Sequence, residues 1–353
     1  MTSTTTRPDP PAPAVDAPRD LAVELRSVSR GFGDVKALDD LTLVAPSNSI
    51  TVLLGPNGAG KTTAIRMITG ALDPDEGAVR VFGLDPSVDG EEVRTRCGVV
   101  SAKPALYDRL SGWDNLMYSA ELYGLGRGDR AAAAIRESAG RFGIEQALDQ
   151  QVGGYSTGMK TRLALARSVM HGPELLLFDE PTSGLDPESS HAVLELIREM
   201  AATGSTVVMC THLLLEAEGL AEQVVVLDAG TDLIAGPPGE LTKRFWPNLV
   251  VRLDAEDPAG LDRLAGLDGV LAYDRDDRGL AASCGGAAAG AATVQLDDLA
   301  RVPEIVFALA EAGVRVTRVE PHIPSLEDLY FAVRDGREAF SERGHAEAGE
   351  VAA

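Results

Sequence analysis

A glycine-rich segment between an apolar run and a helical pattern has the residue types that bind phosphate. Its spacing is GxxxxGK[ST], and it consists of Gly55, Pro56, Asn57, Gly58, Ala59, Gly60, Lys61 and Thr62, followed by Thr63. Glycines let the backbone N–H groups turn inward, and the helix that follows presents its positive end to an anion. Lys61 adds a compact charge for the β and γ phosphates, and the Thr62 hydroxyl can ligate Mg²⁺. An ordinary glycine-rich turn is the alternative, but the full pattern in this context favours a phosphate-binding loop.

Two adjacent carboxylates follow a second apolar run. The run Leu175–Phe178 leads into Asp179, and Glu180 comes directly after it. The carboxyl end of a parallel strand lies in the crevice where such sheets bind ligands. Asp179 can therefore hold Mg²⁺ through water, and Glu180 can orient or deprotonate an attacking water. Alone, such a run usually marks a strand that reaches solvent, so this interpretation depends on the phosphate loop.

The segment Tyr155–Lys160 predicts a helix start, with Ser156 as the N-cap and a helical pattern that runs to Gly172-Pro173. It is similar to the LSGGQ signature of the ABC ATPase family. The resemblance implies that this helix end, with Ser156 and Gly158, meets the γ-phosphate of ATP bound by the opposite subunit. It therefore implies a head-to-tail dimer with a second copy or a homologous ATPase subunit. Capping is compatible with this role, because one serine can do both.

Further residues match the same family in the same order along the chain. Phe32 in RGFG resembles the aromatic residue that stacks on adenine, although a core phenylalanine is the alternative. Asp186 resembles the loop residue that contacts the opposite subunit, although it also precedes Pro187 as a plain N-cap. His212, after an apolar run, resembles the histidine that contacts the γ-phosphate. The resemblance thus implies ATP and Mg²⁺ as cofactors, with Lys61, Glu180 and His212 as the catalytic residues and Thr62 and Asp179 at the metal.

The sequence also departs from the family pattern at two places. The family has a glutamine that touches Mg²⁺ and links the site to the membrane subunit, and Ala102 stands at that position. Because alanine offers no oxygen to a metal, we expect weakened metal positioning or coupling, or water in the gap. Tyr155, Thr157 and Met159 replace the usual signature residues, as in one exporter branch. Ser156 and Gly158 remain, so we do not expect inactivity.

Alternating elements must position these residues. Short β-branched and apolar runs predict strands at 21–33, 41–54, 175–178, 206–210 and 223–228, and helical patterns follow at 61–72, 157–173 and 187–204. Alternation of strands and helices predicts an α/β fold: a P-loop NTPase (ABC ATPase) domain with a largely parallel sheet, helices on both of its faces and a helical subdomain.

The composition changes near residues 245–248, where we place a domain boundary. Residues 21–244 are the expected ABC ATPase domain and residues 245–336 a small α+β C-terminal domain. In the latter we expect strands at 249–255 and 314–320, a hairpin in 270–284, helices at 258–267, 302–313 and 325–333, and a flexible loop at 285–292. Residues 1–20 and 337–353 are expected to be disordered tails. The C-terminal unit resembles the extension of drug-resistance exporter ATPases of the daunorubicin/doxorubicin type.

Composition excludes several classes of protein. With 353 residues and a net charge of -22, the chain is large enough for a sizeable core and too acidic for nonspecific nucleic-acid binding. No run approaches the roughly 20 apolar residues that cross a bilayer, and the proline-rich start lacks a secretory apolar core. The cysteines Cys97, Cys210 and Cys284 lack CxxC spacing, which is typical of a reduced cytosolic protein. We therefore expect a cytoplasmic protein without nucleic acid as a partner.

We interpret the chain as the ATP-hydrolysing subunit of an ABC transporter. It would sit peripherally on the inner face of the plasma membrane through a separate transmembrane permease, and would drive export of a drug-like, lipid or natural-product cargo. The alternative is a soluble or regulatory ABC-type ATPase with weak hydrolysis, not coupled to transport. Members that act on ribosomes carry two cassettes in one chain and those that act on DNA carry long coiled coils; neither feature is present in this sequence.

Overall fold

The computed structural model describes residues 20–274, 291–322 and 324–334. The two expected tails lie almost wholly outside these residues. So do Cys284 and most of the hairpin and loop expected between residues 270 and 292.

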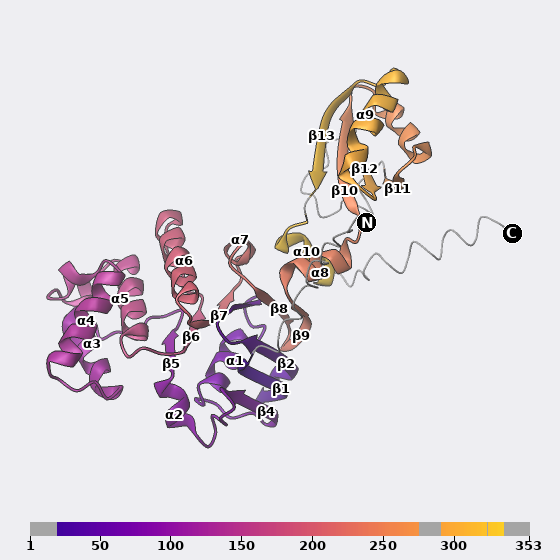
Figure 1. Cartoon of the computed structure of the whole chain (residues 1–353). Helices are drawn as coiled ribbons and strands as arrows, with labels where there is room; N and C mark the ends of the chain where they lie inside the picture. Colours follow the sequence, from indigo (N-terminus) through magenta and orange to yellow (C-terminus); the bar gives the residue numbers. More distant parts are fainter. Residues whose placement is uncertain (1–19, 275–290, 323, 335–353) are drawn as a thin grey trace, which may run out of the picture.

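A six-stranded sheet forms the centre of the fold, in the order β5-β6-β7-β3-β8-β9 (Figure 1). Neighbours from β5 to β8 are parallel, and β9 pairs antiparallel with β8. The strands are Ile50–Leu54 (β3), Cys97–Val100 (β5), Leu175–Asp179 (β6), Thr206–Thr211 (β7), Gln223–Asp228 (β8) and Thr231–Gly236 (β9). Every residue of β3, β6 and β7 is buried, as continuous apolar runs require in a sheet covered on both faces.

Successive residues along the strands alternate between the helices on the two faces of this sheet. Leu53 and Leu177 share a core with α1 (Lys61–Ile68), whereas Val52 and Phe178 pack with α6 (Pro187–Ala202). Successive strand residues point to opposite faces, so each apolar strand serves both cores. The predicted fold class, a largely parallel sheet between helices, is confirmed.

An antiparallel sheet, not expected as a separate unit, packs against the α1 side of the fold. Its order is β2-β1-β4, and it shares its core with α1. Its strands are Leu21–Phe32 (β1), Val35–Pro46 (β2) and Glu76–Val81 (β4). The helix α2 (Gly90–Thr95) leads from it to β5. This sheet places the end of β1 beside the phosphate loop.

A group of helices lies between β5 and β6 in the chain and at one end of the molecule (Figure 1). It consists of α3 (Gly112–Leu122), α4 (Asp129–Arg141) and α5 (Thr157–Val169), with short 3₁₀ turns at Glu145–Ala147 and Val152–Gly154. Ser111 caps α3 and Ser156 caps α5, each accepting a backbone hydrogen bond. This is the helical subdomain that the sequence predicted.

A four-stranded antiparallel sheet follows at the other end of the molecule, in the order β11-β12-β10-β13 (Figure 1). Its elements are β10 (Leu249–Ala255), β11 (Val270–Asp274), β12 (Ala291–Leu296), β13 (Val316–His322) and α9 (Val302–Glu311), with 3₁₀ turns at Pro258–Gly266 and Leu299–Arg301. Residues 258–266, expected as an α-helix, thus have 3₁₀ geometry. One face of the sheet packs on α9 and the longer 3₁₀ segment.

The last helix returns to the first part of the chain. Leu329 and Tyr330 of α10 (Leu326–Arg334) share a core with Leu241 and Phe245 of α8 (Pro238–Phe245). The helix also contacts β9 and α7 (Leu214–Ala217). The closing helix therefore packs with α8 in a core that also contains Val250 of β10.

Candidate functional site

The phosphate loop connects β3 to α1 in a conformation that requires glycine. Gly58 has a φ of 88° and Gly60 a φ of 103°, both in the left-handed region. A Cβ on Gly60 would lie 2.5 Å from Leu38 Cδ2 and 2.7 Å from Ala37 O. The GxxxxGK[ST] spacing is therefore tied to β2 as well as to the turn itself. The loop lies at the carboxyl end of a parallel strand, the edge where such sheets bind ligands.

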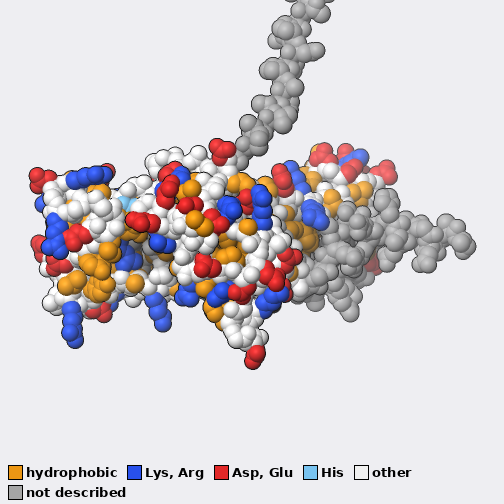
Figure 2. Space-filling view, turned by 90° about the horizontal axis from the view of Figure 1, so that it is seen from below, with side chains coloured by type: hydrophobic (Ala, Val, Ile, Leu, Met, Phe, Trp, Pro, Cys, Tyr) orange, Lys and Arg blue, Asp and Glu red, His pale blue; other side chains and the backbone are white. Residues whose placement is uncertain are grey.

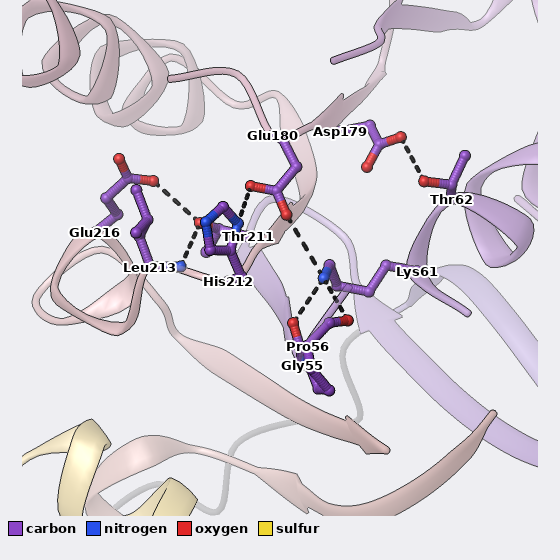
Figure 3. A network of polar contacts seen from close by, with 10 residues as sticks. All are labelled: Gly55, Pro56, Lys61, Thr62, Asp179, Glu180, Thr211, His212, Leu213 and Glu216. Atoms are coloured by element: carbon purple, nitrogen blue, oxygen red, sulfur yellow. Dashed lines mark hydrogen bonds and ion pairs between the residues drawn. The ribbon is translucent and has the colours of Figure 1, made fainter. Parts of the chain in front are cut away.

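Lys61 is buried at the start of α1 and folds back over this loop (Figure 3). Its Nζ donates hydrogen bonds to Gly55 O at 2.7 Å and to Pro56 O at 3.2 Å, and it lies 3.5 Å from Glu180 Oε1. A buried ammonium group needs such partners. Two loop carbonyls and Glu180 thus hold the charge against the phosphate loop, where it can bind phosphate oxygens.

Thr62 and Asp179 join the two predicted motifs (Figure 3). The Thr62 hydroxyl donates a 2.7 Å hydrogen bond to Asp179 Oδ2. The Asp179 side chain lies at the end of β6, is 5% exposed, and its Oδ1 has no hydrogen-bond partner in the structure. A buried carboxylate oxygen without a partner, beside a hydroxyl, fits a hard cation such as Mg²⁺.

Glu180 occupies a backbone conformation that is unusual for its type. Its φ is 54°, and its N–H donates to Cys210 O at 2.9 Å. A residue other than glycine in the left-handed region stores strain of about 1 kcal/mol or more. This turn aims the carboxylate away from the end of β6 and toward Lys61 and His212 (Figure 3). The strain is placed at the carboxylate that the sequence assigned to catalysis.

His212 follows β7 and contacts Glu180 directly. His212 Nδ1 lies 2.7 Å from Glu180 Oε2. The turn that carries the histidine is closed by Thr211, whose hydroxyl accepts from Leu213 N at 3.0 Å and donates to Glu216 at 3.1 Å. A histidine N–H at this distance can orient a carboxylate that accepts a proton.

Lys61, Thr62, Asp179 and Glu180 line one cavity of about 410 Å³. Phe32 lies at its wall with 46% of its surface exposed, and Ala102 lies at the wall near Thr62 and Asp179. The full lining is Phe32, Ala37, Asn57, Gly58, Ala59, Gly60, Lys61, Thr62, Thr63, Ala102, Asp179 and Glu180. The cavity therefore brings together Lys61, Thr62, Asp179 and Glu180, with an aromatic ring at the edge. Gly55, Pro56 and His212 are not in this lining, and each contacts it through Lys61 or Glu180.

A second predicted group lies elsewhere on the chain. Ser156, Gly158 and Asp186 are not among the described residues that line this cavity. They sit close to one another instead: a Cβ on Gly158 would lie 4.0 Å from Leu185 and 3.8 Å from Ser189 Oγ. Asp186 accepts from Ser189 N at 2.9 Å and caps α6, and these hydrogen bonds lower the pKa of its carboxyl group. One chain thus carries two separate predicted halves of a site.

Some residues at the cavity were missed by reasoning from motifs. Ala37 lines the wall from β2, and the Arg30 guanidinium lies over the Phe32 ring at 5.2 Å. For Arg30 the period of the predicted strand 21–33 was the available signal, because residues two apart lie on the same face. Ala37 lay outside the predicted strands, so no such signal was available for it. Cys97 and Cys210 are buried free cysteines, and burial raises the pKa of the Cys97 thiol to about 12. They are core residues, as expected.

Two features are absent from the described residues. None of the helices there is both long enough and apolar enough to span a bilayer. Within the same residues, no three side chains of His, Cys, Asp or Glu are grouped so that they could hold a metal ion.

Comparison with known proteins gives consistent matches. The family model described as "ABC transporter" matches residues 38–183. The chain is 37% identical to the ABC transporter ATP-binding protein NatA of Bacillus subtilis over 61% of this chain and 89% of that protein. It is 33% identical to the daunorubicin/doxorubicin resistance ATP-binding protein DrrA of Streptomyces peucetius, over 88% of this chain and 92% of that one. A solved ATP-binding subunit of an ABC transporter superposes with a TM-score of 0.58 and 29% identity, covering 64% of this chain and 93% of the other.

Proposed function

The chain belongs to the ABC transporter ATP-binding proteins, and we propose that it pairs head-to-tail around ATP and Mg²⁺ to drive a separate transmembrane permease. It is an ATP-binding subunit of a family that hydrolyses ATP. The observation that carries the dimer is the separation of Ser156, Gly158 and Asp186 from the cavity of Lys61. Each chain holds two halves that a second copy can complete.

The proposed chemistry follows from positions and charges. Lys61 and the loop amides bind the β and γ phosphates, and the capped end of α5 in the other subunit meets the γ-phosphate. Glu180 accepts a proton from the attacking water, and His212 holds the Glu180 carboxylate in place. Thr62 and Asp179 would hold Mg²⁺, which neutralises charge on the phosphates. Phe32 stacks on adenine.

Ala102 affects one part of this mechanism, the positioning of the metal. It lies at the cavity wall where the family resemblance places a glutamine. A second cavity, of about 330 Å³, also touches Thr62 and Asp179 and is lined by Ser101. Without a long side chain at residue 102, we propose that water fills part of this space and that the metal is positioned less firmly.

A groove near the helical subdomain supports the permease as partner. The groove has a volume of about 520 Å³, and its wall includes Tyr107, Tyr118, Tyr123, Arg94 and Arg167. Figure 2 shows hydrophobic side chains gathered at the end of the molecule that carries α3, α4 and α5, among charges of both signs. Exposed aromatic rings beside arginine are typical of protein interfaces. We propose that the permease docks here, which would place the chain at the inner face of the plasma membrane.

The exporter direction rests on the relatives. The daunorubicin/doxorubicin resistance protein aligns over 88% of this chain. The Nod factor export ATP-binding protein I of Rhizobium etli is 33% identical over 69% of this chain and 77% of that protein. We propose export of a drug-like, lipid or natural-product cargo. The alternative of a regulatory protein with weak hydrolysis finds no support in these relatives.

Mixing two disabled variants tests the composite site. Lys61→Ala removes the positive charge that binds the phosphates, and Ser156→Glu places a negative charge at the start of α5. Each variant alone should therefore fail to form an ATP-dependent dimer. A mixture of the two restores one intact composite site, so we expect dimers that retain ATP, measured by light scattering and bound nucleotide. No ATP-dependent dimer in the mixture, while the wild-type chain forms one, would reject the head-to-tail arrangement. If Glu180→Gln neither retains ATP nor dimerises, the proposed function itself fails.

A further inference from the structure

The face of Phe32 is covered by a cation from its own strand. Arg30 and Phe32 are two residues apart at the end of β1, so their side chains lie on the same side of the strand. The Arg30 guanidinium carbon lies 5.2 Å from the centre of the Phe32 ring, within the range of a cation–π contact. The ring itself is 46% exposed and lines the phosphate-loop cavity. It therefore has a cation as neighbour and open space for a ligand.

The arginine is held in place by the segment before β4. Arg30 Nη1 donates to Asp75 Oδ1 at 2.6 Å and to Asp73 O at 3.1 Å. The other oxygen of the same carboxylate, Asp75 Oδ2, accepts from Gly31 N at 2.8 Å. One carboxylate thus fixes both the guanidinium and the backbone just before Phe32. The Arg30 side chain is 25% exposed and the Asp75 side chain 49%, so solvent reaches this ion pair.

We propose that Arg30, braced by Asp75, is a positioning residue that sets the preference of this site for an adenine nucleotide over bare phosphate. The proposal rests on the proposed function, in which Phe32 stacks on the base. A fixed cation on one side of the ring holds it in a single orientation, so a base that stacks on it need not order a mobile side chain. The cation also attracts the π electrons of the ring, so the opposite face of the ring stacks more favourably on an electron-rich purine. The phosphates, bound by Lys61, gain nothing from this contact.

Binding of two ligands that share the phosphate group tests the proposal. ADP and inorganic pyrophosphate are titrated by calorimetry into the full chain with Mg²⁺. We expect Arg30→Ala to weaken the binding of ADP by roughly three- to tenfold and to leave the affinity for pyrophosphate unchanged. Arg30→Lys keeps the charge without the planar fork and should be intermediate. Unchanged pyrophosphate affinity also shows that the loop is still folded.

A matched control comes from the same sheet. Arg80 Nη1 donates to Asp85 Oδ2 at 2.6 Å, which is an Arg–Asp pair of similar geometry that does not contact Phe32. Arg80→Ala removes the same charge from the chain and should leave both affinities unchanged. If Arg30 acted only by long-range attraction of the phosphates, both variants would bind both ADP and pyrophosphate more weakly.

The pairing with Phe32 is tested by a double variant. In a Phe32→Ala background, Arg30→Ala should cause no further loss of ADP affinity, because its effect passes through the ring. Two outcomes overturn the proposal: Arg30→Ala has no effect on ADP while Phe32→Ala weakens it, or Arg30→Ala weakens ADP and pyrophosphate equally. If Phe32→Ala leaves ADP unchanged, the assignment of adenine to Phe32 under the proposed function fails instead.

Discussion

His212 Nδ1 lies 2.7 Å from Glu180 Oε2, and this contact joins the ends of two neighbouring parallel strands. The other oxygen of the same carboxylate faces Lys61 Nζ at 3.5 Å. Each oxygen of Glu180 therefore has a different cationic or donor neighbour. The backbone of Glu180 is also held in the left-handed region. This geometry leads to the first two predictions.

Glu180→Gln should abolish turnover without abolishing ATP binding. The amide keeps the shape of the side chain but cannot accept a proton, and general base catalysis contributes roughly a hundredfold or more. We expect phosphate release to fall by at least that factor while ATP affinity stays within about twofold. Glu195→Gln, an exposed carboxylate on α6, is the control. Equal loss of binding and turnover would contradict the assigned role.

His212→Ala should slow the chemical step less severely. A hydrogen bond to a charged group contributes about 1.5–3 kcal/mol, so we expect roughly a ten- to hundredfold lower kcat with little change in ATP affinity. His212→Gln keeps a donor and should recover part of the rate. His191, exposed on α6, provides the matched alanine control. A wild-type rate for His212→Ala would remove this residue from the mechanism.

Thr62→Val should alter the dependence on magnesium. Valine has the shape of threonine but no hydroxyl, so Asp179 loses its 2.7 Å partner and the metal loses a ligand. We expect the Mg²⁺ concentration for half-maximal ATP turnover to rise roughly tenfold, and Thr62→Ser to behave as wild type. Thr69→Val, which removes a hydroxyl at the other end of α1, serves as the control. An unchanged magnesium requirement would argue against this ligand set.

Ala102→Gln should strengthen metal positioning. The new amide would extend from the cavity wall toward Thr62 and Asp179, where it can supply an oxygen. We expect a lower Mg²⁺ concentration for half-maximal turnover, and altered ATP turnover and transport when the permease is present. Ala133→Gln, on the exposed side of α4, tests for a general effect of the substitution. Equal rates and equal transport for wild type and Ala102→Gln would reject the expectation.

His171 should make stability depend on pH. It stacks on Tyr123 with ring centres 3.7 Å apart, and burial lowers the pKa of its imidazole below 6.5. Between 6.5 and the lower folded value, the unfolded chain binds the proton more readily than the folded chain. The free energy of unfolding therefore falls as the pH falls through this window. The stability is not reduced by His171 above the window.

His171→Phe isolates this contribution, because it keeps a ring against Tyr123 but does not titrate. Urea midpoints at about one pH unit above and below 6.5 should differ less in the variant than in wild type. His191→Gln, an exposed histidine, should keep the wild-type difference. A variant with the full wild-type difference would assign the pH dependence to other groups.

Prediction from the sequence was most reliable where the functional residues are neighbours along the chain. The phosphate loop, the start of the helix after it and the strand that leads to Asp179 were predicted, although the helix ends at Ile68 and not at residue 72. Elements without a strong local signal were not: the separate sheet β2-β1-β4, strand β9 and the 3₁₀ form of residues 258–266 appear only in the structure. Their conformations depend on which surfaces they cover.

The sequence by itself determined the chemistry, because glycine spacing, a lysine and two adjacent carboxylates limit what a strand–loop–helix can bind. Only the tertiary structure decided which of these groups meet. It joins Thr62 to Asp179 across 117 residues, and it leaves Ser156 outside the cavity of its own chain. It also places Arg30 on Phe32 and returns α10 to α8. Such contacts follow from the packing of both sheet faces, which no local pattern encodes.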